Sequence, residues 1–258
     1  MSRRAFVLDR RRGKHSSGAR QSNFFTSMGS LTKYFGLAMM GNAHMMELAV
    51  QQSLDHWNLT NNFDIVLMVL KLLKVCHTNR EDLVLEVFDV VYEKTGCFDI
   101  LFDDVIFGTC LYPSKERLEE IEWYLKVASG RTFTFQNEDV PMIDLPNVGW
   151  TLAAHAASKG RTIVLLLFLR YGADPNKAAA LLTSSPFPEE VLRLILRAMP
   201  YPAPNVLKIE PTLVLVPRLK HLCKTVVRNV LIKNIPDAIY DLPIPFELKE
   251  YLDLLKDF

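Results

Sequence analysis

Residues 147–176 read NVGWTLAAHAASKGRTIVLLLFLRYGADPN, and this stretch decides the fold. A segment of small residues around Ala156 comes first, and small side chains let two helices pack closely. Gly160 permits a tight turn, and the apolar segment 163–169 then supplies a face for neighbouring helices. Gly172 follows, where a helix end favours a residue that tolerates positive φ. The pattern therefore predicts a pair of packed helices that ends in a polar turn.

The same stretch resembles an ankyrin repeat, whose pattern is G-x-T-P-L-H-x-A-A-x-x-G, an apolar helix and then G-A-D-P-N. The shared positions are Gly149, Thr151, Ala156, Ala157, Gly160, Gly172, Ala173, Asp174, Pro175 and Asn176. The resemblance implies that Gly172, Asp174 and Asn176 form the turn that leads to the next repeat. The chain has Thr151-Leu152-Ala153-Ala154 where the family has T-P-L-H. Because the usual proline and histidine are missing, we expect a less regular repeat.

Helical patterns also precede this segment. From about Leu31 onward we expect helices rather than strands, because apolar residues recur at spacings of three and four in 63–75 and 83–91. Ser114 is placed to cap a helix, and Gly96 is placed to end one. A single helix pair cannot bury both of its apolar faces, so stacked neighbours must share a core. For residues 31–140 an irregular helical bundle remains the alternative.

A second informative segment lies near the C-terminus. Residues 217–255 read PRLKHLCKTVVRNVLIKNIPDAIYDLPIPFELKEYLDLL. Leu219, Cys223 and Val227 are spaced by four and therefore lie on one helical face. Leu222 and Val226 flank them and complete an apolar stripe of the kind that binds in a groove. Cys223 fits such a stripe because a free cysteine behaves as a small apolar residue.

This segment resembles a SOCS box. Its first helix matches the BC-box pattern L-x-x-x-C-x-x-x-(A/V/I/L), which in the family binds elongin C paired with elongin B. The resemblance assigns elongin binding to Leu219, Leu222, Cys223, Val226 and Val227. An ordinary amphipathic helix pair that caps the repeats is the alternative.

The second part of the segment matches the cullin box. Its L-P-φ-P form, associated in the family with cullin-5 and its RING subunit, assigns cullin binding to Leu242, Pro243, Ile244 and Pro245. Prolines fix φ, so this loop loses little entropy when it binds.

The predicted fold is all-α, with a degenerate ankyrin-like helical stack followed by a three-helix SOCS box. We expect a disordered basic leader at 1–30, a divergent helical or ankyrin-like region at 31–140, ankyrin repeats at 141–205 and the SOCS box at 213–258. The leader holds seven basic residues and one acid within residues 1–20.

Composition and motifs limit the possible functions. The net charge of +1 argues against a nucleic-acid or membrane partner, and no apolar run reaches the roughly 20 residues that a membrane span needs. The four cysteines form no C-x-x-C pair, and the histidines are scattered, so we expect no metal site. No phosphate-binding or hydrolase motif occurs, so we expect no catalytic residues and no cofactor. A cytoplasmic or nuclear location agrees with these features.

Together the resemblances predict a non-catalytic adaptor that links an unknown protein substrate to a ubiquitin ligase. The alternative is an ankyrin-repeat interaction scaffold that recruits no ligase, and an enzyme with an unrecognised site is a third hypothesis. The region 61–140 holds fifteen acidic and eight basic residues. We expect Glu119, Glu120 and Glu122 to lie on a solvated helix face, where they could attract a basic substrate.

Overall fold

The computed structural model describes residue 36 and residues 43–75, 80–109, 112–182, 188–202, 204–209, 218–231 and 234–256. The predicted basic leader lies outside these residues. The chain divides into two compact units, Met1–Leu72 and Leu73–Phe258, and each is described by itself. None of the helices within the described residues is long and apolar enough to cross a membrane.

The described part of the first unit consists of α2 (Ala43–Thr60) and most of α3 (Asp64–Val75). Ala49, Val50 and Leu54 of α2 are buried, which agrees with one apolar face on an amphipathic helix. The two helices are joined by a short turn, where the ring of Trp57 meets the edge of Phe63 at 5.9 Å between centroids. The helix expected from the spacing in 63–75 is confirmed.

The second unit starts with four helical segments: α4 (Glu81–Thr95), the 3-10 helix η1 (Asp99–Leu101), α5 (Asp103–Ile106) and α6 (Lys115–Val127). Gly96 ends α4 in a left-handed conformation, and its N–H donates to the carbonyl of Tyr92 at 2.7 Å. Ser114 caps α6, because its hydroxyl oxygen accepts a hydrogen bond from the N–H of Arg117 at 3.2 Å. Both expected helix ends are therefore confirmed.

The ankyrin-like stretch forms a helix pair, α7 (Leu152–Ser158) and α8 (Thr162–Arg170). Thr151 caps α7 by accepting from the N–H of Ala154 at 3.2 Å, so this cap forms without the usual proline. The alanines of α7 are buried, as close packing between the two helices requires. Gly172 has φ +93° directly after α8, and Asp174 then caps the short helix α9 (Pro175–Ala178).

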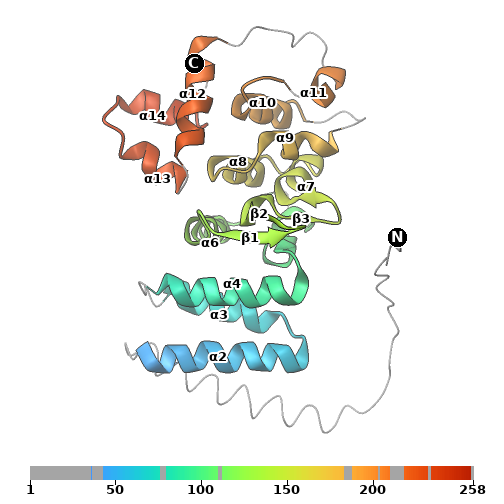
Figure 1. Ribbon diagram of the computed structural model, residues 1–258, viewed down its shortest axis with the longest axis vertical. Coiled ribbons are helices and arrows are strands. Elements are labelled where there is room, and N and C mark those ends of the chain that lie inside the picture. Colours follow the sequence, from blue (N-terminus) through green and yellow to red (C-terminus); the bar gives the residue numbers. More distant parts are fainter. Residues whose placement is uncertain are drawn as a thin grey trace. The chain divides into compact units, whose positions relative to one another are not determined.

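Successive helix pairs lie in layers. The first helices α5, α7 and α9 contact one another in order, and so do the second helices α6, α8 and α10 (Glu189–Ala198). Figure 1 shows α6, α8 and α10 in this order from bottom to top, with α7 and α9 beside them. The 3-10 helix η3 (Ala179–Leu181) continues α9, and α11 (Pro204–Ile209) follows α10 along the chain. Phe102 meets the rings of Tyr124 and Phe168 edge-on, so one aromatic core crosses adjacent layers.

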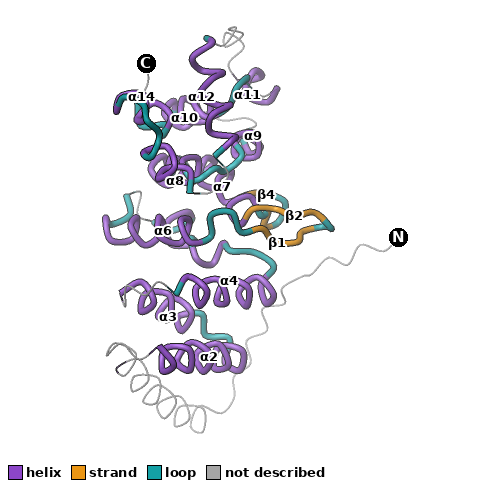
Figure 2. The backbone as a smooth tube through the Cα atoms, turned by 60° about the vertical axis from the view of Figure 1, so that its left-hand side comes forward, coloured by secondary structure: helices purple, strands orange, loops and turns teal. Residues whose placement is uncertain are grey.

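The structure also contains two hairpins, which the helical prediction for this region missed. Strands β1 (Thr132–Phe135) and β2 (Glu138–Pro141) pair antiparallel, and Figure 2 shows them extending from the helical layers. The 3-10 helix η2 (Met142–Asp144) leads to the shorter pair β3 (Pro146–Asn147) and β4 (Trp150–Thr151). These strands are few and short, so the all-α class is confirmed.

The prediction of a solvated acidic face on α6 is wrong at Glu120. This carboxylate is buried and accepts a hydrogen bond from the hydroxyl of Tyr124 at 2.5 Å. The guanidinium of Arg117 lies 3.0 Å from it and balances its charge. Glu122 faces Arg170 at 3.7 Å, so only Glu119, paired with Lys115, is close to the predicted arrangement.

Candidate functional site

The helix α12 (Leu219–Val230) has two opposite faces of different character. One face is exposed and largely apolar, since Leu219 is 77% exposed, Val226 is 62% exposed and Cys223 is exposed between them. The other face is buried and polar, with Lys224, Thr225 and Arg228 turned inward. This arrangement inverts the usual one for an amphipathic helix, in which the apolar face is buried. An exposed apolar stripe of this kind indicates a binding surface.

The buried face of α12 is held by Arg228. Its guanidinium donates to the carbonyls of Leu252 at 2.8 Å, Leu169 at 2.5 Å and Arg170 at 3.2 Å. Burial lowers the pKa of Arg228 to about 10, which leaves the side chain charged near neutral pH. Two of these carbonyls belong to the end of α8, where the last carbonyls of a helix lack partners within the helix. Arg228 therefore joins α12 to the helical stack.

Lys224 uses a different partner on the same face. Its side chain is almost completely buried, and its ammonium nitrogen lies 4.5 Å from the ring centroid of Tyr251. An aromatic face stabilises such a cation by its quadrupole. Tyr251 belongs to α14 (Phe246–Leu252), so this contact connects the first and last helices of the C-terminal segment.

A small apolar cluster holds the three C-terminal helices together. Ile235 and Ile239 of α13 (Ile235–Tyr240) pack with Leu252 of α14. The partly buried side chains Val227, Leu231, Leu242 and Ile244 cover this cluster. Asn234 starts α13 from a left-handed conformation, with Pro236 in the first turn, where a proline costs no hydrogen bond.

The loop 242–245 alternates between partly buried and exposed residues. Leu242 and Ile244 pack against the apolar cluster, whereas Pro243 and Pro245 are exposed. The N–H of Ile244 donates to the carbonyl of Leu242 at 2.8 Å, which tightens the loop. The two prolines therefore face solvent from a rigid backbone, and α14 begins immediately after Pro245.

A buried carboxylate provides a further connection to the stack. Asp253 is completely buried and accepts two hydrogen bonds from the guanidinium of Arg170, at 2.7 and 3.1 Å. Burial raises the pKa of Asp253, and the bonds from Arg170 oppose that rise. Arg197 of α10 donates to the carbonyl of Leu254 at 2.8 Å. The C-terminal helices are thus fixed to both α8 and α10.

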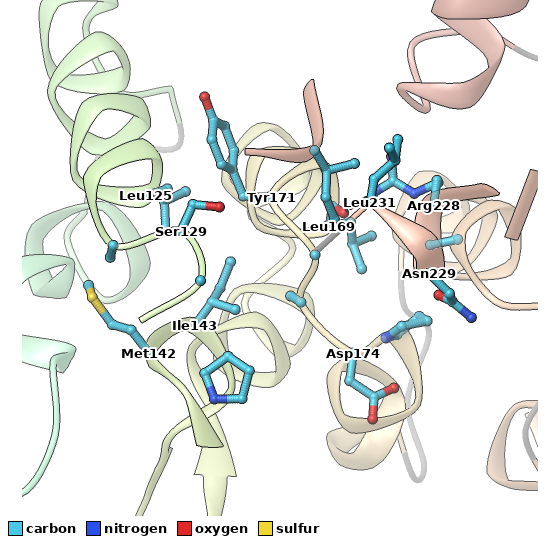
Figure 3. Close-up of a pocket in the computed structure, with 18 of the residues that line it drawn as sticks. Leu125, Ser129, Met142, Ile143, Leu169, Tyr171, Asp174, Arg228, Asn229 and Leu231 are labelled. Atoms are coloured by element: carbon cyan, nitrogen blue, oxygen red, sulfur yellow. Dashed lines mark hydrogen bonds between the residues drawn. The ribbon is translucent and has the colours of Figure 1, made fainter. Parts of the chain in front are cut away.

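A cleft of about 560 Å³ lies where the C-terminal helices meet the stack. Figure 3 shows Leu125 and Ser129 on one side of it and Arg228, Asn229 and Leu231 on the other. The turn at Gly172 lies in its wall, and an added Cβ there would come within 2.9 Å of the Cδ1 atom of Ile235. Gly172 thus permits a close approach between the stack and α13.

The structure places the predicted site residues in different surroundings. Leu219, Cys223 and Val226 share the exposed face of α12, Leu222 is half-buried, and Val227 packs against the apolar cluster. In the predicted repeat turn, the carboxylate of Asp174 accepts from the N–H of Asn176 at 2.8 Å, and Asn176 is exposed. Within the residues that the structure describes, no three His, Cys, Asp or Glu side chains are grouped to hold a metal ion.

Residues 215–253 match the SOCS box family model. The match covers α12, α13 and α14, the helices whose geometry is given above. Comparisons with curated proteins and with solved structures find no match. The SOCS box indicates an adaptor role with elongin B, elongin C and a cullin-based ubiquitin ligase.

The buried polar contacts of the SOCS box were not predicted from the sequence. Lys224, Arg170 and Asp253 are of types that usually lie in solvent, so composition gives no reason to expect them inside. The sequence did hold one indication of these contacts. If the apolar stripe of α12 is kept exposed for a partner, only the opposite, polar face of the helix can pack against the rest of the chain.

Proposed function

We propose that this chain is the substrate-recognition adaptor of a cullin-5 RING ubiquitin ligase. Elongin C, paired with elongin B, would bind the exposed face of α12, with Leu219, Cys223 and Val226 at its centre and Leu222 and Val227 at its edge. Cullin-5 would bind at the loop 242–245. The layered helix pairs, which we assign to divergent ankyrin repeats, would hold the substrate.

The observation that carries this proposal is the exposed apolar face of α12. Leu219, Cys223 and Val226 lie on one side of a helix whose other side is fixed by buried hydrogen bonds. Burying a leucine or valine side chain contributes about 1.5–3 kcal/mol, so covering this face is favourable for a partner with an apolar groove. The fixed buried side also means that binding does not need to order the helix.

An adaptor of this kind supplies proximity and no chemistry. By holding a substrate lysine near a ubiquitin thioester on the ligase, it raises the effective concentration of the reacting amine. The ligase supplies the reactive thioester, and the adaptor requires only two firm binding surfaces and a stable connection between them. The contacts of Arg228 and Asp253 with α8 support such a connection.

The first test is co-expression of the full chain with elongin B and elongin C, followed by size-exclusion chromatography. We expect a stable ternary complex with the native chain and its loss with Leu219→Asp, because a charge would enter an apolar groove. Leu219 is the first residue of α12, where an aspartate favours the helix, so the loss would not reflect unfolding.

Asn229→Asp is the matched control for this test. It adds the same charge at an exposed position in the last turn of the same helix, outside the apolar face, and elongin binding should persist although an aspartate there opposes the helix dipole. A native chain that forms no complex with the elongins would leave the alternative, a helical interaction scaffold that recruits no ligase.

The cullin assignment has its own test. Pro243→Ala with Pro245→Ala removes two exposed rings and leaves the partly buried Leu242 and Ile244 in place. We expect cullin-5 affinity to fall about tenfold, since the loop becomes more flexible before binding, while elongin binding stays unchanged. Pull-down of cullin-5 by the preassembled elongin complex measures this. Equal loss of both partners would mean that the box had unfolded, and unchanged cullin binding would contradict the assignment.

A further inference from the structure

A second cavity, of about 350 Å³, lies between the two hairpins and is separate from the SOCS box. Its lining includes Phe135 and Glu138, which are opposite each other in the β1–β2 hairpin. Trp150 of β4 forms another part of the wall, and Lys177 of α9 lies at the border. We call this cavity and the adjoining tip at Val148 the hairpin cleft.

The tip of the β3–β4 hairpin carries an unusual residue. Val148 has a positive φ of +50° and is 89% exposed. A branched side chain in this conformation is strained, and its apolar surface gains nothing from contact with water. An asparagine or glycine there would relieve the strain and suit the solvent better. Strain held at an exposed position indicates a use beyond folding.

The neighbouring hairpin provides an internal comparison. Its turn residues Gln136 and Asn137 also have positive φ, +53° and +70°, but both are polar. The fold therefore does not demand an apolar residue at such a turn. Two positions beyond Val148, Trp150 is 37% exposed, and tryptophan is a residue type that often anchors a bound partner.

The charges beside the cleft favour a basic partner. The carboxylate of Asp144 lies 3.9 Å from the ammonium group of Lys177, so these two charges balance each other. Glu138 is exposed at the start of β2, and among the described residues no ion pair to it is found. Asp139, next to it, is exposed as well. A cation could pair with Glu138 and also lie over the face of Trp150.

We propose that the hairpin cleft binds an extended segment of a protein in which an apolar side chain stands next to an arginine. The apolar side chain would contact Val148, Phe135 and Trp150, and the guanidinium would pair with Glu138. Calling this protein the ligase substrate rests on the proposed adaptor function, but the binding itself does not.

The test uses the full chain in its elongin complex and two sets of fluorescent dodecapeptides. One set has a central Leu-Arg or Phe-Arg pair on Gly-Ser flanks, and the matched set has Glu in place of Arg. Fluorescence anisotropy gives the affinities, and the indole N–H signals of Trp57, Trp123 and Trp150 report the place of binding. We expect the arginine set to bind at least about tenfold more tightly and to shift the Trp150 signal.

Two variants sharpen this result. Val148→Asn should weaken the arginine peptides about fivefold or more while keeping or raising the melting temperature, since it relieves strain. Glu138→Gln should remove the preference for arginine over glutamate. Val75→Asn removes the same side chain from another exposed position and should change nothing. A loss of affinity without a loss of stability cannot be explained by unfolding.

The outcomes separate this inference from the proposed function. Equal binding of both peptide sets, unchanged affinity in Val148→Asn, or shifts confined to Trp57 and Trp123 would each overturn the hairpin cleft as a binding site. If the elongin complex forms in the same samples, the adaptor proposal stands without it. Conversely, arginine-dependent binding by a chain that does not bind elongins would support the cleft and remove the ligase role.

Discussion

Three arginines place their guanidinium groups at chain reversals in this protein. Arg117 donates to the carbonyl of Leu101 at 2.6 Å, Arg161 donates to Ile106 at 3.2 Å, and Arg228 donates to Leu169. Carbonyls at the end of a helix lack partners within it, and the planar fork of a guanidinium can reach several of them. Single residues therefore connect separate helical elements by donating to carbonyls at the ends of these elements.

Gly172 shows how much can depend on one missing side chain. In Gly172→Ala the backbone at φ +93° should cost about 1–2 kcal/mol in the free energy of unfolding. The new Cβ would also come within 2.9 Å of the Cδ1 atom of Ile235, which belongs to the apolar cluster of the SOCS box. Overpacking of this kind adds about 1–3 kcal/mol. Urea denaturation of the purified chain measures the sum.

Gly96→Ala separates the two contributions to that loss. Gly96 also follows a helix with positive φ, at +71°, but an added Cβ there meets no atom within 4 Å. Gly96→Ala should therefore lower the free energy of unfolding only by the cost of the backbone conformation. The difference between the losses in the two variants then gives the free energy needed to displace Ile235. Equal losses of stability in the two variants would mean that the side chain of Ile235 moves aside at no cost. Gly172 would then be needed only for its backbone conformation.

At the scale of elements, helix ends that are fixed by residues close in the sequence could be predicted. Ser114 and Gly96 act through neighbours in the sequence, so their roles could be deduced from the order of residues. The β1–β2 hairpin was missed although residues 132–135 alternate polar and aromatic types, which is the period of a strand. The surrounding helical pattern masked this short alternation.

The candidate site also has one part that could be predicted from the sequence and one part that could not. The apolar stripe of α12 follows from spacing alone, and the structure places Leu219, Cys223 and Val226 on its exposed face. The buried contacts of Asp253 with Arg170 join residues 83 positions apart in the sequence. Such a pair depends on tertiary packing, and no local pattern encodes it. The hairpin cleft was likewise hidden, because its two hairpins were not expected.

At the scale of the molecule, the helical layers of the second unit are joined to the SOCS box through buried polar contacts. Arg228 donates to carbonyls at the end of α8, and the carboxylate of Asp253 accepts hydrogen bonds from the guanidinium of Arg170, the last residue of α8. Polar contacts of this kind require particular geometry, because a buried group that loses its partner is costly. The box is thus held in one orientation to α8 and α10, which a flexible linker would not achieve.

Because of this connection, we expect elongin binding at α12 to stabilise the end of α8. Adding elongin B and elongin C to the native chain should slow hydrogen exchange of the amides of Tyr171 and Gly172 by at least about fivefold, the lower range of typical coupling between sites. Arg228→Met should keep elongin binding, since the exposed face of α12 is unchanged, but it removes the bonds to Leu169 and Arg170. Elongins should then slow exchange at α12 without slowing it at the end of α8, with amides of α4 as the reference. Equal protection of α8 in both chains would show that the apolar cluster around Ile235 transmits the effect and that the guanidinium is dispensable for it.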